Sequence, residues 1–199
     1  DIRAERTDDY QDISNAASLL VRLEIEGANV GGRWDELARL SETRVDDRCN
    51  VFADLHYLIS LEAGDRRRAA DRMLASVSAH AEEDTDMGRI AGTAGEPAAL
   101  GLDAYYRGSY FSAFRHLSAA RPHLVAIGGS HAQRDVFERI TIDAALKAGL
   151  AQDAEDLLRA RLSLRGGLDR FAAERLEQAA RMKRAAAIMQ DKRLRAVPA

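Results

Sequence analysis

The sequence is poor in the residues that cross-link or break a chain, with one cysteine and three prolines among 199 residues. A single cysteine, Cys49, cannot form an intramolecular disulfide, so a disulfide-stapled secreted fold is excluded and a reducing compartment is favoured. No apolar run approaches the roughly 20 residues that cross a bilayer, and no basic-then-apolar secretory leader opens the chain. We therefore expect a cytoplasmic protein without a membrane span.

Positive and negative charges nearly balance over the whole chain, which has a net charge of −3. The segment 165–199 is the exception, because it holds nine Lys or Arg residues against four Asp or Glu residues. These cations are distributed around an expected helix, which is typical of a solvated face. We predict no nucleic-acid partner from them.

Glycine followed five residues later by alanine recurs at a spacing of 44 and then 41 positions. The three copies are Gly64 with Ala69, Gly108 with Ala113, and Gly149 with Ala154. A period of about 40 residues is typical of stacked helix pairs. The glycine would give the turn a left-handed residue, and the small alanine would let the two helices approach closely. The sequence thus predicts an all-α fold.

Helices are predicted throughout residues 12–165, which we expect to form one helical-repeat domain. The acidic lead 1–11 shows no periodicity and is expected to fray, and 166–199 is expected to form a basic capping helix with a tail. The glycine-punctuated segment 82–96 is expected to be the longest loop. Helix starts are predicted at residues that cap well: Asp12, Asp46 or Asp47, Asp65 and Ser130.

The segment Tyr106-x-Gly-x-Tyr-x-x-Ala113 resembles the central signature of a tetratricopeptide repeat. Three longer stretches, 17–34, 52–56 and 127–137, resemble the C-terminal half of tetratricopeptide repeat protein 38 family members; Gly-Gly-Ser-His-Ala-Gln-Arg-Asp is the most specific piece. The resemblance implies a superhelical stack of antiparallel helix pairs with no established chemistry. It also implies a further helical half upstream, which we expect to be absent from this chain.

The richest polar cluster runs from Ser130 to Asp135. At a helix N-terminus, free backbone N–H groups and Arg134 would favour an anion. His131 and Asp135 are four residues apart and share a helix face, so they could orient an imidazole or hold a metal. One alternative is that the cluster only fixes a helix junction. Another is a small-molecule-binding or hydrolytic enzyme that combines His131 and Asp135 with Asp54 and His56.

The favoured interpretation is a scaffold that binds a protein or peptide in a concave groove. No catalytic, cofactor or metal residue is assigned, because the sequence has no phosphate-loop motif and no zinc-ligand spacing. Self-association as a homodimer through the C-terminal helix is a further alternative. The predicted partner-binding residues are Asn50, Asp54, His56, Tyr57, Tyr106, Ser130, His131, Gln133, Arg134 and Asp135.

Overall fold

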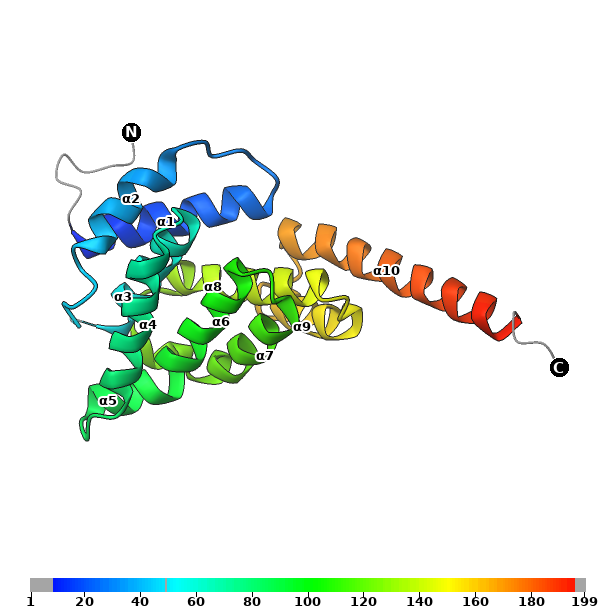
Figure 1. Cartoon of the computed structure of the whole chain (residues 1–199). Coiled ribbons are helices and arrows are strands. Elements are labelled where there is room, and N and C mark those ends of the chain that lie inside the picture. The colour runs from blue at the N-terminus through cyan, green and yellow to red at the C-terminus, as the bar shows by residue number, and fades with distance from the viewer. Residues whose placement is uncertain (1–8, 49, 196–199) are drawn as a thin grey trace. The chain divides into compact units, whose positions relative to one another are not determined.

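The computed structural model describes residues 9–48 and 50–195, and all regular secondary structure within them is helical (Figure 1). The prediction of an all-α chain is confirmed for this part of the sequence. Predictions that concern Cys49, or the frayed lead as far as residue 8, lie outside the described residues.

Contacts divide the chain into two compact units, and the division falls between Thr141 and Ile142 within helix α8 (His131–Lys147). The predicted domain boundary at 165/166 lies within the second unit. The second unit comprises the rest of α8, α9 (Ala151–Leu164) and α10 (Arg170–Arg195).

The first unit is arranged around α3 (Val51–Ala63), which packs against α1, α2, α4 and α6. Of its 13 residues, Val51 through Glu62 are all buried, on every side of the helix. A helix that is buried all round belongs to the centre of a core. The other elements of this unit are α1 (Tyr10–Ile25), α2 (Arg33–Glu42), α4 (Arg67–Ala81), α5 (Asp86–Ile90), the π-helical turn η1 (Ala91–Gly95), α6 (Glu96–Tyr106), α7 (Tyr110–Ala120) and the 3-10 segment η2 (Arg121–Ile127).

The capping residues of α1 and α3 differ from the predicted ones. Asp9, rather than Asp12, caps α1, because the Asp9 side chain accepts a hydrogen bond from the Gln11 backbone. Asn50, rather than Asp46 or Asp47, caps α3, with Oδ1 accepting from Ala53 N at 2.7 Å. At α3 the cap is the polar residue directly before the first buried residue, Val51, whereas α1 begins most of a turn earlier than predicted.

The turn at Gly64 works differently from the other two repeat turns. Gly64 has a φ of −90°, and the left-handed residue is Asp65 at +55°, so Asp65 makes no side-chain cap for α4. Gly64 is needed for space instead, because an added Cβ would lie 2.4 Å from the Ala38 Cβ. At Gly108 and Gly149, φ is +75° and +79° and an added Cβ would meet open space. The alanines that follow the three turns are all buried: Ala69, Ala113 and Ala154.

The prediction of a long loop over 82–96 is wrong, because α5, η1 and α6 follow one another from Asp86 to Tyr106. Two of the three glycines in this segment, Gly88 and Gly95, are positions of close approach. A Cβ at Gly88 would lie 2.0 Å from the Glu83 carbonyl oxygen, and one at Gly95 would lie 2.7 Å from Val51 Cγ1. Tertiary packing therefore outweighs the low helix propensity of glycine here.

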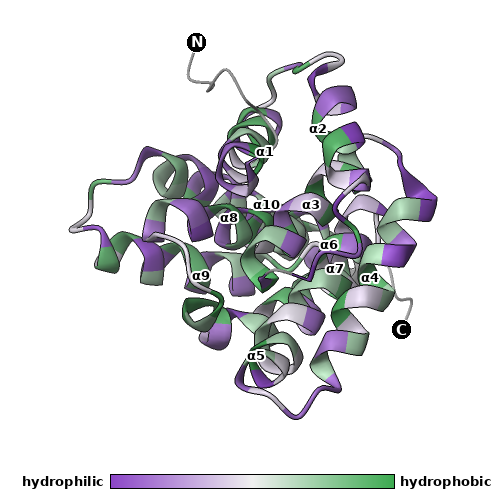
Figure 2. Ribbon diagram, turned by 90° about the vertical axis from the view of Figure 1, so that its left-hand side faces the viewer, coloured by the Kyte–Doolittle hydropathy of each residue, from purple (hydrophilic) through white to green (hydrophobic). Residues whose placement is uncertain are grey.

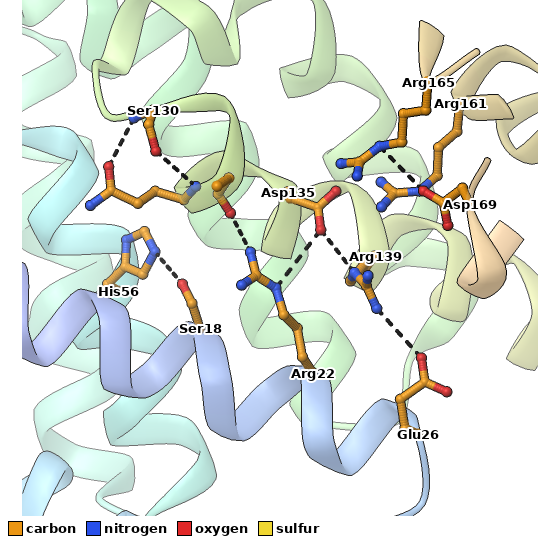
Figure 3. A network of polar contacts seen from close by, with 12 residues as sticks. Ser18, Arg22, Glu26, His56, Ser130, Asp135, Arg139, Arg161, Arg165 and Asp169 are labelled. Atoms are coloured by element: carbon orange, nitrogen blue, oxygen red, sulfur yellow. Dashed lines mark hydrogen bonds and ion pairs between the residues drawn. The ribbon is translucent and has the colours of Figure 1, made fainter. Parts of the chain in front are cut away.

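In the second unit, α9 and α10 pack against each other and are joined by a buried ion pair (Figure 3). Arg161 is 1% exposed, and its Nε lies 2.9 Å from Asp169 Oδ2. The other oxygen of Asp169 accepts from Ala172 N at 3.0 Å, in the first turn of α10. The Arg161 guanidinium also lies 5.3 Å from the centroid of the Phe171 ring.

Hydrophilic and hydrophobic residues alternate along most of the ribbons in Figure 2, as expected for helices with one buried side. Among the described residues, no helix combines the length and the apolar character that crossing a membrane would require.

Replacing Gly64 with alanine is expected to lower the free energy of unfolding by about 1–3 kcal/mol, the usual cost of overpacking a filled site. Gly92→Ala is the matched control, since its added Cβ would have no neighbour nearer than 3.6 Å. Urea unfolding followed by circular dichroism measures both variants. A Gly64→Ala midpoint equal to that of the wild type would contradict the close approach of α2.

Candidate functional site

The Ser130–Asp135 cluster begins α8 and fixes the turn in front of it. Ser130 N donates to Gln133 Oε1 at 2.8 Å, and Gln133 N donates back to Ser130 Oγ at 3.3 Å, which is a reciprocal capping box. Arg134 donates to the carbonyl oxygens of Gly128, at 2.8 Å, and Gly129. These three side chains therefore hold the glycine turn in place, while His131 is exposed.

Asp135 lies between two arginines that connect α1 with the first part of α8 (Figure 3). Its Oδ2 is 2.8 Å from Arg139 Nε and 3.8 Å from Arg22 Nε, and the residue is 8% exposed. Arg22 also donates to the Ala132 carbonyl oxygen, and Arg139 reaches Glu26 at 3.4 Å. This network satisfies the carboxylate and ties two helices together.

His56 is fully buried and its ring nitrogens both have partners inside the first unit. Nδ1 donates to the Phe52 carbonyl oxygen at 2.7 Å, which leaves Nε2 to accept from Ser18 Oγ at 3.1 Å. The ring also packs 4.3 Å from the Phe52 ring and 5.1 Å from the Phe137 ring, centroid to centroid. Burial lowers the pKa of His56 to about 4, so the imidazole is neutral at physiological pH.

The four residues of the enzyme alternative do not form one site. Among the described residues, no hydrogen bond or ion pair joins any two of them. His56 bonds to Ser18, Asp135 bonds to arginines, and His131 stands at the surface. Likewise, no group of three or more His, Cys, Asp or Glu residues in the described ranges is arranged to hold a metal ion.

Two further predicted residues of α3 are inside the core and not on a groove. Asp54 is 4% exposed and Tyr57 is 3% exposed. Burial raises the pKa of Asp54 to about 7; the Asp47 carboxylate adds to this and Arg48 opposes it. Tyr106 is half-buried at the end of α6, where burial, helped by nearby Glu24 and Glu62, raises the pKa of its hydroxyl. A partner on the surface could not reach Asp54, His56 or Tyr57.

An ionic cluster that the sequence analysis missed joins α3, α4 and α6. Arg67 lies 2.7 Å from Glu62 Oε2 and 3.2 Å from Asp103 Oδ1, and Arg107 Nε lies 2.6 Å from the same Asp103 oxygen. Burial raises the pKa of Glu62 to about 7. Glu62 and Arg67 lie about 40 residues before Asp103 and Arg107 in the sequence, so no local spacing indicates that the two pairs meet.

Asn50 and Gln133, both predicted as partner-binding residues, share a surface cleft of about 370 Å³. The cleft lies where the starts of α1 and α3 meet the segment that leads into α8. None of its lining side chains carries a formal charge. The lining residues are Tyr10, Gln11, Asn50, Phe52, Ile127, Gly128, Gly129 and Gln133.

Tyr10, Gln11 and Phe52 line the cleft but were not predicted as site residues. A signal for Phe52 was present, because it begins the stretch 52–56, one of the three that carry the family resemblance. The three stretches that carry the family resemblance meet in the structure, because His56 contacts both Ser18 and Phe137 there. Tyr10 and Gln11 lay in the lead that was expected to fray, and nothing in their local pattern indicated a site.

No protein-family model matches the chain, and no solved structure matches it.

Replacing Asp54 with asparagine should change how stability depends on pH. Between about pH 4 and 7 the native carboxyl keeps a proton that the unfolded chain has released, so raising the pH lowers the free energy of unfolding. The variant loses this contribution to the pH dependence of the free energy of unfolding, which is at most about 1.4 kcal/mol per pH unit. The opposite contribution of His56, which favours the native state as the pH rises from 4 to 6.5, is present in both proteins and cancels.

Urea unfolding at intervals from pH 4 to 8 measures this difference, with the exposed Asp153→Asn as the control. The stability of Asp54→Asn relative to the wild type should increase with pH, and more steeply than that of Asp153→Asn. A constant difference for both variants would contradict a proton held by the buried carboxyl.

Proposed function

We propose that this chain is a protein- or peptide-binding helical scaffold, built as a tetratricopeptide-like superhelical stack of antiparallel helix pairs. The glycine turns and buried alanines at a period near 40 residues support the repeat. The packing of α3 on the helices of neighbouring pairs supports the stack. Membership of the tetratricopeptide repeat protein 38 family and a cytoplasmic location remain parts of this proposal.

The observation that carries the binding function is the uncharged cleft between α1, α3 and the segment before α8. Its volume of about 370 Å³ lies within the range of roughly 300–1,000 Å³ that is usual for ligand sites. Aromatic and carboxamide side chains together give an adaptable surface, because rings supply contact area and amides both donate and accept hydrogen bonds. Such a surface favours peptide binding over catalysis, since its lining includes no Asp, Glu, His, Lys, Arg, Ser or Cys side chain.

Panning a phage library of random twelve-residue peptides against the purified chain tests this function. Peptides should be enriched, and Tyr10→Ser should weaken their binding about tenfold, which corresponds to about 1.4 kcal/mol. Tyr10 is 39% exposed and lines the cleft, so the change removes contact area without disturbing the core. The control is Phe111→Ser, an aromatic residue of α7 that is 57% exposed and does not line the cleft. Absence of enrichment, or equal effects of the two variants, would contradict the proposal.

Self-association is a second candidate, supported by exposed apolar residues on α10. Ile188 and Met189 are 58% and 57% exposed, in a part of the helix where residues 183–191 are all exposed. A second copy could cover them. Light scattering of the purified chain should then show a dimer that Met189→Glu converts to a monomer. A monomer at every concentration of the wild type would contradict this candidate.

A further inference from the structure

We infer that the cleft recognises the main chain of an uncharged, extended peptide segment, through the side-chain N–H of Asn50 and the side-chain carbonyl of Gln11. This inference rests on the proposed peptide-binding function and names the class of peptide.

The Asn50 side chain is held by its role as a helix cap, and this orients its remaining donor. The backbone N–H of Ala53 can only donate, so the atom that it contacts at 2.7 Å is the Asn50 carbonyl oxygen, Oδ1. The Nδ2 group donates to none of the described residues. The cleft therefore contains an amide donor whose position is already fixed by α3.

Gln11 provides the complementary acceptor. Its Nε2 donates to Tyr10 Oη at 3.1 Å, while its Oε1 accepts from none of the described residues. Gln133 is different, because its Oε1 accepts from Ser130 N at 2.8 Å and its Nε2 donates to Asn15 Oδ1 at 3.3 Å. The cleft thus offers the Asn50 amide as a donor group and the Gln11 carbonyl as an acceptor, which complement the C=O and N–H groups of a peptide main chain.

The surroundings of these groups disfavour a charged ligand. No lining side chain is ionised, and the neighbouring Arg134 already donates to the carbonyl oxygens of Gly128 and Gly129. An ionised side chain that entered the cleft would lose water without gaining an opposite charge. Tyr10, which is 39% exposed, can instead pack against an apolar side chain of the peptide, beside the small exposed edges of Phe52 and Ile127.

The glycine turn shapes one wall of the cleft for close approach. Gly129 has a φ of +72°, and an added Cβ would lie 2.6 Å from the Phe52 ring. The turn can therefore lie directly on Phe52 only when residue 129 has no side chain. This contact leaves backbone, rather than side chains, at that wall, which suits a ligand bound by its main chain.

The competing interpretation is an anion bound at the start of α3, whose free N–H groups and dipole would attract an acidic peptide. The two interpretations predict different charge preferences. A main-chain site prefers neutral peptides and tolerates varied side chains, whereas an anion site prefers peptides that contain glutamate.

Fluorescence anisotropy with three pools of labelled nine-residue peptides distinguishes them. One pool is randomised among Ala, Ser, Gln, Val and Tyr, and the other two carry a central Glu or a central Lys in the same background. The neutral pool should bind the wild-type chain at least about fivefold more tightly than either charged pool. Preference for the glutamate pool, or no binding by any pool, would overturn the inference. The phage experiment tests the proposed function separately.

The decisive variant is Asn50→Asp, because aspartate keeps the capping oxygen for Ala53 N but replaces the amide donor with an acceptor. Its affinity for the neutral pool should fall about tenfold while its melting temperature stays within a few degrees of the wild type. Asn29→Asp is the matched control, since Asn29 likewise accepts a backbone hydrogen bond, from Gly31 N at 2.8 Å, and does not line the cleft. Gln11→Leu should weaken the neutral pool by a similar factor. Unchanged binding in both Asn50→Asp and Gln11→Leu would overturn the inference even if peptides bind.

Discussion

The structure of the first unit depends on complete burial of α3. Because every side of this helix is covered, its polar residues must be satisfied inside the core, and Ser18 of α1 does this for His56. The start of the same helix is packed by Phe52 against the Gly129 turn. α3 therefore positions both α1 and the segment before α8, and the cleft lies where these three parts meet.

Much of the local structure could be predicted from the sequence, because the signals are themselves local. Gly108 and Gly149 mark turns whose left-handed residues require glycine, and Ser130 with Gln133 forms a capping box over four residues. The same reasoning found Asn50 and Gln133, which line the cleft. Capping strength alone could not choose between Asn50 and the aspartates just before it, since all of these residue types cap helices well.

The rest depends on tertiary contacts that a pattern does not contain. Gly88 and Gly95 indicated a loop because glycine is a weak helix former, but both allow close approach of other segments within a helical run. Asp54 and Tyr57 suggested a solvent-facing side of α3, and only the surrounding helices show that this side is buried. The ionic cluster of Glu62, Arg67 and Asp103 likewise appears only when three helices are brought together.

The chain contains one tryptophan, Trp34, whose indole N–H donates to Glu24 Oε1 at 2.9 Å within the first unit. Intrinsic tryptophan emission consequently reports the environment of that unit alone. The second unit, which has no tryptophan, contributes to the ellipticity at 222 nm but is optically silent in that emission. A comparison of the two signals during denaturation gives a direct measure of the cooperativity between the two units, with no need for a label or for a separate fragment.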